Sequence, residues 1–586
     1  MIRRLGSLLL AAAAFIIFQA EFVNAKPLVA SPPATAITLS VDATEAPRKL
    51  FHARMTIPVS PGPLTLVYPK WIPGEHGPTG PIVNLAGLKL TAGGKSVTWR
   101  RDDVDMYAFH LEVPPGVKEL EVALDFLSPT FAGGFTAGAS TTSHLAIVTW
   151  NQLLLYPEGS NISDVTFKAN LHLPAGWKFG TSLPVAGQSA SKVEFAPVSL
   201  ERLVDSPVLA GEYFLVIPLA ANPPNEIDIA ADNRADLEIS AELTTTLKHV
   251  VSEATSLFGA THYEHYHFLL TLSDHTAHFG LEHHESNDSR VPERALLEPA
   301  LRDVALGVLP HEFVHSWNGK YRRPAGLATQ NYQEPMKGEL LWVYEGLTQY
   351  LGNLLAARSG LWTPQQYRDH LAEIAADLDH RPGRLWRPLI DTTIAAQVLY
   401  GAPGEWNSSR RGVDFYDEGW LIWLDTDTKI RELTGGKRSL DDFCKRFHGA
   451  PSTPPMVKTY LFDDVVAALN DVAPFDWRTF LLTRLNTTDF HAPLGGIERG
   501  GWKLAYEPTP SGFLKDLEQV REGIEMGYSI GLRLNEDGSI ADVIEGLAAA
   551  KAGIGPGMKI LACNGKAYSA EVLRDSVKGT TDPKQR

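Results

Sequence analysis

Two histidines four residues apart, with a glutamate beside the first, form the clearest candidate for chemistry in this sequence. They are His311, Glu312 and His315 in the run His-Glu-Phe-Val-His. On a helix, residues four apart lie on one face about 6 Å from each other, so both imidazoles can reach one tetrahedral ion. Glu312 would project beside that ion, where its carboxylate can take a proton from an activated water. The segment predicts a metal-dependent hydrolytic site.

Such a site needs a third protein ligand that still leaves one position open for water. Glu345 is the one carboxylate in an apolar stretch, 340–351, that reads as a largely buried helix. A lone buried carboxylate is costly unless it is paired or bound to a metal, so we predict that Glu345 is the third ligand. Because proline disturbs a helix interior, we expect the histidine helix to begin with Pro310 in its first turn.

The arrangement resembles the glycyl aminopeptidase family of zinc peptidases, peptidase family M61. The resemblance rests on segment 311–318 and on the run Trp-Val-Tyr-Glu-Gly, 342–346, whose glutamate follows the second histidine after 29 intervening residues. A Trp-x-x-Glu-Gly run also occurs in the neighbouring M1 aminopeptidases, where the gap is shorter. The resemblance implies one Zn²⁺ per chain, held by His311, His315 and Glu345, with Glu312 as general base and proton shuttle.

Two further site positions follow from the resemblance alone. The segment Gly280-Leu281-Glu282 is similar to the strand-edge segment with which these enzymes bind substrate, and Glu282 matches the carboxylate that pairs with the free α-amine. Tyr416 opens a helix in a Tyr-x-x-Gly run and is similar to a tyrosine that stabilises the developing oxyanion. The alternatives are a surface position for Glu282 and a packing role for Tyr416.

The elements that must position these residues predict a multidomain chain. Between about residues 36 and 218, short runs alternate apolar and polar residues between Gly and Pro, which is typical of an antiparallel β-sandwich. After residue 235, apolar residues recur every three or four positions, and helices dominate to about 485 with a small sheet near 266–272. We therefore predict an all-β sandwich domain over 26–235 and a mostly α, thermolysin-like (α+β) zinc peptidase domain over 236–522.

The last segment, 523–586, returns to alternating apolar positions around the turn Glu536-Asp537-Gly538. It resembles a PDZ domain, which captures a peptide C-terminus by strand addition near a segment such as 529–532. The alternative is a purely structural module packed on the catalytic domain. The chain stops at Arg586, where a further helix and strand of a PDZ domain would follow, so we expect an incomplete PDZ-like β domain.

Two other segments are interpreted as structural. The Trp-, Pro- and Gly-rich segment 68–74 lies between predicted strands and indicates turn chemistry rather than a binding loop. Seven histidines lie between residues 261 and 284, but their spacing fits no closed set of ligands, so we predict no second metal site there.

Composition and the first residues define compartment and partners. The 586 residues carry 53 Lys and Arg against 68 Asp and Glu, a formal net charge of −15, without an extended basic cluster, so nucleic acid is not an expected partner. Residues 1–25 read as a signal peptide cleaved after Ala25, the alternative being a single membrane anchor. We expect a soluble protein, periplasmic or secreted, without a membrane span in its mature form.

The cysteine count limits the metal chemistry. Cys444 and Cys563 are the only cysteines, and we expect two free thiols rather than a disulfide. Any metal must therefore use histidine and carboxylate ligands.

The sequence thus predicts a zinc aminopeptidase that releases small N-terminal residues, Gly or Ala, from peptides with a free N-terminus. One alternative is a non-catalytic peptide-binding protein that keeps the peptidase fold, against which the complete set of metal and base residues argues. The other is a zinc endopeptidase.

Overall fold

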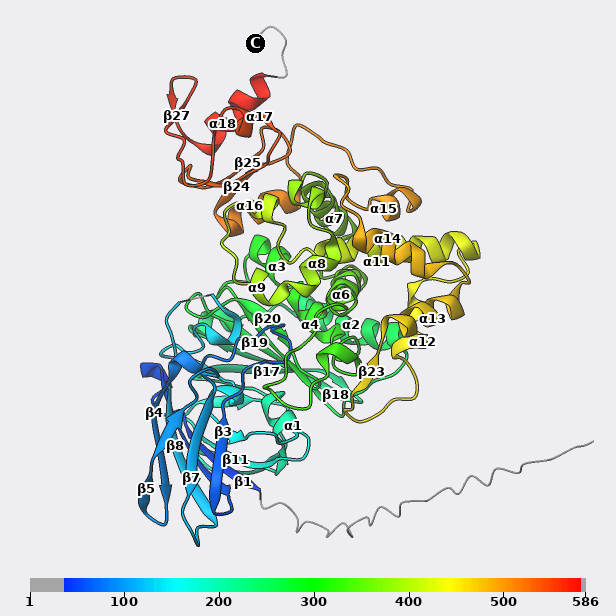
Figure 1. Cartoon of the computed structure of the whole chain (residues 1–586). Coiled ribbons are helices and arrows are strands. Elements are labelled where there is room, and N and C mark those ends of the chain that lie inside the picture. Colours follow the sequence, from blue (N-terminus) through cyan, green and yellow to red (C-terminus); the bar gives the residue numbers. More distant parts are fainter. Residues whose placement is uncertain (1–35, 132, 581–586) are drawn as a thin grey trace, which may run out of the picture. The chain divides into compact units, whose positions relative to one another are not determined.

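The computed structural model describes residues 36–131 and 133–580, which belong to one unit of the chain (Figure 1). The predicted signal peptide and its cleavage site after Ala25 lie outside the described residues. Within them we find no helix with the length and apolar character that a membrane span requires.

The first region consists of three β-sheets around one apolar core. The strands alternate as expected: β2 (Leu50–Pro58) buries Phe51, Ala53, Met55 and Ile57 and turns the residues between them toward less buried positions. The expectation of an antiparallel sandwich is corrected at one place, because β1 (Ile37–Asp42) pairs parallel with β11 (Thr166–His172) at the middle of the largest sheet.

The largest sheet has the order β13-β14-β11-β1-β2-β8-β4-β5, with β15 also pairing with β11. Its other strands are β4 (Leu85–Ala92), β5 (Lys95–Val97), β8 (Glu119–Leu127), β13 (Val185–Gln188), β14 (Lys192–Phe195) and β15 (Val198–Ser199). The second sheet comprises β10 (Tyr156–Pro157), β3 (Gly62–Val67), β7 (Ala108–Val113) and β6 (Trp99–Arg101). The third comprises β12 (Lys178–Gly180), β16 (Val208–Gly211) and β9 (Leu145–Val148), and the short helix α1 (Leu200–Val204) precedes β16.

The boundary of this first region lies earlier than the predicted residue 235. Strands β17 (Tyr213–Ala221) and β18 (Pro224–Ala231) pair with each other, and β18 pairs with β19 (Tyr266–Leu272) of the catalytic region. β18 is parallel to β19 and almost wholly buried, so it lacks the alternation that marks a strand with one exposed face. Because β17 follows β16 after a single residue, no change in composition marks the crossing between domains.

The catalytic region places a five-stranded sheet against a set of helices (Figure 1). The sheet order is β17-β18-β19-β21-β20, with β21 (Ser286–Val291) inside and β20 (Phe279–Glu282) at the edge. Four helices carry candidate site residues or flank them: α4 (Val308–Val314), α5 (Leu341–Tyr344), α6 (Gly346–Ser359) and α11 (Asp417–Thr434).

The remaining helices and the two short strands complete this region. They are α2 (Ala241–Phe258), α3 (Pro299–Ala305), α7 (Pro364–Asp379), α8 (Leu389–Ile394), α9 (Ala396–Leu399), α10 (Asn407–Arg410), α12 (Leu440–His448), α13 (Phe462–Val472), α14 (Trp477–Asn486), α15 (Gly495–Arg499), α16 (Gly512–Arg521), β22 (Arg322–Pro324) and β23 (Lys458–Tyr460).

The C-terminal module has a small apolar core of its own. It contains β24 (Gly523–Met526), β25 (Leu532–Asn535), β26 (Ile540–Val543), α17 (Ala548–Lys551), β27 (Ala562–Cys563), β28 (Lys566–Ala567) and α18 (Ala570–Gly579). β25 is the central strand and pairs with β24 on one side and β26 on the other, so neither of its edges is free for strand addition. The PDZ assignment therefore stays a prediction.

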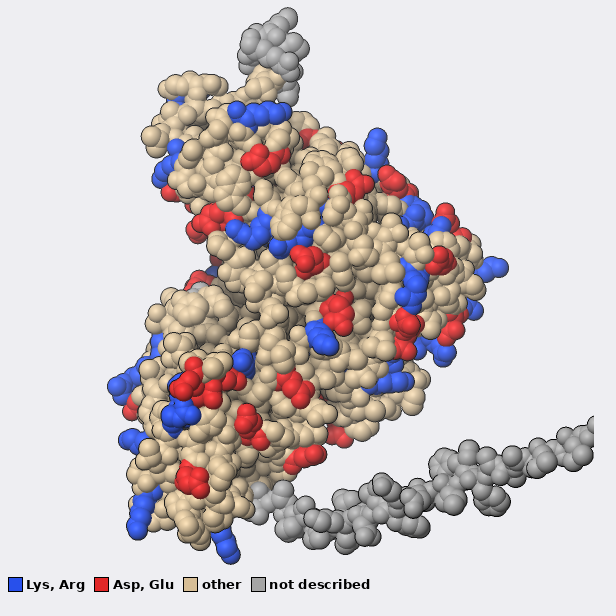
Figure 2. Space-filling model, in the orientation of Figure 1, with Lys and Arg blue, Asp and Glu red and all other residues tan. Residues whose placement is uncertain are grey.

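Two surface and chemical features complete the description. Cys444 is buried in α12 and Cys563 lies in β27, and both are free thiols. On the face shown in Figure 2, Lys and Arg side chains are interspersed with Asp and Glu and form no continuous basic patch.

Candidate active site

Helix α4 presents the two histidines in the way that their spacing predicts. It begins at Val308, so Pro310 lies in its first turn, as expected. His315 follows the last helical residue with helical backbone angles, and the His311 and His315 rings have centroids 5.0 Å apart. The His315 side chain is buried and the His311 side chain is 13% exposed, so the pair faces a cavity rather than open solvent.

Glu345 sits at a break that the sequence did not predict. The expected helix 340–351 is divided into α5 and α6, with Glu345 between them. Gly346, the next residue, lies against Gly419 of α11, where a Cβ on Gly346 would be 2.8 Å from the Gly419 Cα. Because both positions lack a side chain, the first turns of α6 and α11 approach closely. This brings Tyr416, just before α11, to the same cavity as Glu345.

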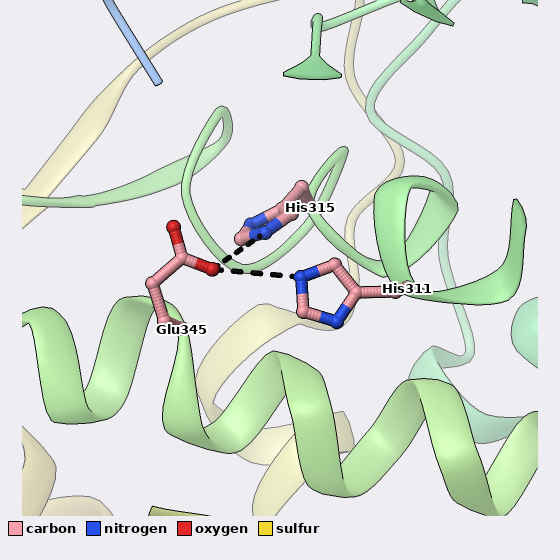
Figure 3. Close-up of side chains that lie close together, drawn as sticks. All are labelled: His311, His315 and Glu345. Carbon is pink, nitrogen blue, oxygen red and sulfur yellow. Dashed lines mark ion pairs between the residues drawn. The ribbon is translucent and has the colours of Figure 1, made fainter. Parts of the chain in front are cut away.

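The three predicted ligands come together (Figure 3). Glu345 Oε2 lies 3.2 Å from His315 Nε2 and 3.5 Å from His311 Nε2. Two ligand atoms bound at about 2.1 Å to a tetrahedral ion are about 3.4 Å apart, so this spacing fits a zinc-sized ion. Glu345 Oε2 is also buried without a hydrogen-bond partner. An oxygen left in that state between two imidazole nitrogens fits a metal ligand.

Hydrogen bonds orient His315 for this role. Its Nδ1 lies 2.9 Å from the carbonyl oxygen of Asn318, and because a carbonyl only accepts, Nδ1 carries the hydrogen. This leaves the Nε2 lone pair facing Glu345. Asn318 in turn donates from Nδ2 to the carbonyl of Val343 at 2.8 Å, which ties the end of α4 to α5. Such outer hydrogen bonds fix the tautomer and direction of a metal-binding histidine.

The site carboxylates have displaced pKa values. Burial opposes ionisation of Glu345, but the adjacent imidazoles of His315, His311 and His76 outweigh it and hold the Glu345 pKa well below its usual range. Burial raises the pKa of Glu312 well above its ordinary value; His311 opposes this shift, and the nearby Glu282 and Glu345 carboxylates add to it. A divalent cation among these groups would favour their ionised forms.

Glu312 faces the edge strand of the sheet. A Cβ on Gly280 would lie 2.1 Å from Glu312 Oε1, so the missing side chain at Gly280 gives this carboxylate its place. Both residues line the same cavity as the metal cluster. Gly280 is therefore brought to the site, beside the proposed base.

Glu282 is buried, and the surface alternative for it is wrong. It is 3% exposed and its Oε1 accepts a hydrogen bond from the hydroxyl of Tyr344. Ligand atoms of Glu282, Glu312 and His315 lie within 4.8 Å of one another. Leu281 lines a neighbouring cavity instead of the one at the metal cluster. The prediction that Leu281 binds substrate therefore stays a prediction that its backbone, rather than its side chain, would have to fulfil.

Tyr416 reaches the site together with a second tyrosine that the sequence did not single out. The Tyr416 and Tyr400 hydroxyls are 2.5 Å apart, and both residues line the cavity. Burial raises the pKa of Tyr416 well above its ordinary value, and the charge of Glu345 adds to the shift. Tyr416 therefore remains protonated at neutral pH and able to donate a hydrogen bond.

The cavity of about 390 Å³ also receives residues from the first region that the sequence analysis missed. Gly74 and Phe135 line it, and Phe135 forms an edge-to-face pair with Phe279 of β20. Segment 68–74 was interpreted as turn chemistry rather than a binding loop, but its last residue, Gly74, borders the cavity, which favours the binding-loop alternative. Nothing in the sequence marked these residues, because they reach the site only through domain packing.

One of the seven clustered histidines also joins carboxylates. His267 Nδ1 lies 2.8 Å from Asp228 Oδ2 and 3.3 Å from Glu226 Oε1, in a group whose ligand atoms lie within 4.8 Å of one another. The spacing argument missed this group because its acids lie on β18. Ion pairing accounts for the contacts, and the Glu226 side chain is 38% exposed.

Comparison with solved structures finds proteins of similar fold. An aminopeptidase N family protein from Idiomarina loihiensis is similar with a TM-score of 0.74 at 20% identity, over 92% of this chain and 92% of that chain. An M1 zinc metallopeptidase from Deinococcus radiodurans matches with a TM-score of 0.48 at 15% identity, over 78% of this chain and 94% of that one. The first likeness shows a shared fold. Among curated proteins, no significant match was found.

Family models match two parts of the chain. Residues 38–212 match the peptidase M61 N-terminal domain, whose end agrees with the change of sheet after β16. Residues 304–422 match the M61 glycyl aminopeptidase and include His311, His315, Glu345 and Tyr416. The chain thus carries the N-terminal domain and the peptidase region of the M61 glycyl aminopeptidase family.

Proposed function

We propose that this peptidase is a zinc aminopeptidase that hydrolyses the bond after a small N-terminal residue, Gly or Ala. The observation that carries the proposal is the buried carboxylate of Glu282 beside Glu312 and the metal cluster in one cavity. In a peptide, the α-amine nitrogen is about 2.5 Å from the first carbonyl carbon. An amine bound at Glu282 would therefore hold the first peptide bond next to Glu312.

The site residues fit a zinc ion, and each of them would have a separate role in the reaction. His311, His315 and Glu345 would hold Zn²⁺, which supplies a Lewis acid that acidifies water and polarises a carbonyl. Glu312 would accept the proton of the attacking water and deliver it to the leaving amine. Its raised pKa suits a group that must hold a proton between these steps.

Tyr416 would donate to the oxyanion that develops on the scissile carbonyl. Its hydroxyl is protonated at neutral pH and is held by Tyr400 in the absence of substrate. A donor already positioned in a buried cavity stabilises developing charge more than a donor in water does.

The preference for a small residue is supported by the aromatic side chains in the cavity. Phe135 contacts Phe279 at 5.7 Å and Tyr400 at 5.1 Å between ring centroids, both edge to face. These rings line the same cavity as Glu282 and reduce the space for a substrate side chain there, which favours Gly or Ala over a bulky residue. β20 ends the sheet and no other described strand pairs with its outer edge, which supports binding of an extended peptide by strand addition.

Hydrolysis of glycyl-anilide and its N-acetylated form by the zinc-loaded protein tests this function. We expect cleavage of glycyl-anilide alone, and loss of the discrimination in Glu282→Gln. Equal cleavage of both compounds would favour an endopeptidase and remove the role given to Glu282. Cleavage of neither, with zinc bound, would favour the non-catalytic peptide-binding alternative.

We also propose that the mature protein acts outside the cytoplasm, because its predicted signal peptide would direct export. N-terminal sequencing of the protein from cell fractions tests this, with Lys26 expected as the first residue. A cytoplasmic protein that retains residues 1–25 would contradict it.

A further inference from the structure

A loop of the N-terminal domain reaches the metal cluster. It lies between β3 and β4 and carries His76, which is 5% exposed and has a left-handed backbone, with φ of +52°. That conformation is uncommon for a residue with a side chain, so surrounding contacts must hold it in place. Such strained positions often occur at functional sites.

His76 contacts a predicted metal ligand directly. Its Nε2 lies 2.5 Å from Glu345 Oε1, and because an ionised carboxylate only accepts, Nε2 donates this hydrogen bond. The other oxygen, Oε2, is the one that faces the two metal-site histidines. The two oxygens of Glu345 are thus divided between the N-terminal domain and the metal cluster.

The ring of His76 is fixed by two tyrosines of the catalytic region. It meets Tyr344 edge to face at 5.4 Å and stacks near Tyr400 at 6.0 Å between centroids. Gly74, two residues earlier, borders Glu282, where a Cβ would lie 2.7 Å from a carboxylate oxygen. The loop is therefore seated among the groups that surround the cluster.

We propose that His76 is a positioning residue that orients Glu345 for metal binding, so that the N-terminal domain completes the metal site. The inference rests on the proposed zinc peptidase function. Within the described residues, no candidate metal-binding group includes His76, so it acts through Glu345 rather than as a ligand. Removal of an outer partner of this kind costs about 10–100-fold in metal affinity.

Two replacements of His76 separate its hydrogen bond from its bulk. His76→Gln keeps a donor, because the glutamine Nε2 is as many bonds from the backbone as the histidine Nε2. His76→Leu has similar size and no donor. We expect His76→Leu to weaken zinc binding by about 10–100-fold and His76→Gln to stay within about threefold of the original protein. Competition of the full-length apoprotein with a chromophoric zinc chelator measures these affinities.

A matched control exists in the same domain. His110 also bonds a carboxylate, with its Nε2 2.8 Å from Asp102 Oδ2, but neither residue lines the active-site cavity. His110→Leu should leave zinc affinity unchanged. If His76→Leu fails to fold, His76→Asn replaces it, because asparagine tolerates a left-handed backbone but its side chain is too short to reach Glu345.

The outcomes are distinct. Unchanged zinc affinity in His76→Leu or His76→Asn would overturn the positioning role. Equal weakening in His76→Gln would also overturn it, since bulk or ring packing rather than the donated hydrogen bond would then matter. A wild-type protein that binds no zinc and cleaves no anilide would refute the proposed function itself, independently of His76.

Discussion

The two regions that flank the catalytic core contact it in different ways. Gly74 and Phe135 of the N-terminal domain line the active-site cavity, and His76 of the same domain forms a hydrogen bond with the predicted metal ligand Glu345. None of the described residues of the C-terminal module, 523–580, lines this cavity. This module contacts α7 and α10 through charged groups, with Arg533 bonded to Asp377 and Asp542 accepting from the backbone of Ser408 at 3.0 Å.

The difference indicates which flanking region belongs to the chemistry. At the cavity and its predicted metal ligand, the contacts of the N-terminal domain are made by a histidine, a glycine and an aromatic ring, which can orient a ligand or shape a pocket. Contacts of the C-terminal module include ion pairs, hydrogen bonds and a ring contact between Tyr528 and His380, all made by residues that do not line the cavity. Substitutions in the N-terminal contacts should alter metal binding and substrate specificity, whereas substitutions in the contacts of the C-terminal module should alter the free energy of unfolding.

The largest loss of activity should follow a substitution in the catalytic core, to which the N-terminal domain and the C-terminal module are both attached. Glu312→Gln removes the proposed base and should lower kcat by about a thousandfold or more, since general-base catalysis alone contributes about 10²–10⁴-fold. Zinc content should stay at one per chain, because Glu312 is not a predicted ligand. Anilide kinetics and elemental analysis measure both quantities. Activity above about a thousandth of the original would argue against the assigned base.

The next effect tests the N-terminal domain as a specificity element. Phe135→Ala opens space between Phe279 and Tyr400 and should improve kcat/KM for leucyl-anilide relative to glycyl-anilide by about 10–200-fold. Phe131→Ala is the matched control, because this nearby phenylalanine is 56% exposed and does not line the cavity. An unchanged ratio in Phe135→Ala would mean that this ring does not limit the substrate side chain.

A smaller effect should separate the C-terminal module from the chemistry. Arg533→Met leaves Asp377 with Arg381 as its remaining ion-pair partner and should reduce the free energy of unfolding by about 2 kcal/mol. Denaturant unfolding measures this loss, and kcat/KM for glycyl-anilide should not change. Lys559→Met, which removes an exposed pair with Asp537, serves as control and should have no measurable effect. A large fall in kcat/KM for Arg533→Met would contradict the conclusion that the C-terminal module does not take part in the chemistry.

The last predicted effect depends on pH and concerns the same contact of the C-terminal module. Burial raises the pKa of Glu373 to about 8, the charge of Asp377 adds to the shift, and the Tyr528 hydroxyl donates to the Glu373 carbonyl at 3.4 Å. Between about pH 4.5 and 8 the folded state then holds more protons than the unfolded state, so this group lowers stability as pH rises.

The substitution Glu373→Gln should remove this loss of stability with rising pH. Its stability relative to the original protein should increase from pH 5 to pH 8 in denaturant unfolding, whereas Glu121→Gln, on the exposed face of β8, should show no such trend. A stability difference that stays flat across this range would contradict the raised pKa of Glu373.

The sequence predicted the metal cluster because its signals are local. The His311 and His315 spacing is a property of one helix, and Glu345 is conspicuous as a carboxylate in an apolar run. Tyr416, Gly280 and Glu282 were found by resemblance, and the structure brings all three to the cavity. Leu281 was included with its neighbours, although its side chain lines a neighbouring cavity.

Other features depend on contacts between distant segments and could not be read from the sequence. His76 is an isolated histidine after a turn, and it meets Glu345 across 269 residues of sequence. The change of sheet after β16 was missed because β17 follows it almost directly and β18 loses its alternation through burial on both faces. The break between α5 and α6 reflects the close approach of Gly346 and Gly419, a pairing that only the packed helices reveal.

Product analysis of a peptide tests the central claim most directly. A decapeptide beginning Gly-Ala, with a free or an acetylated N-terminus, is incubated with the zinc-loaded protein and with Glu312→Gln, and the products are identified by mass spectrometry. We expect the free peptide to lose its N-terminal residues one at a time, the acetylated peptide to stay intact, and Glu312→Gln to cleave neither. Internal cleavage, or shortening of the acetylated peptide, would contradict a zinc aminopeptidase anchored at Glu282.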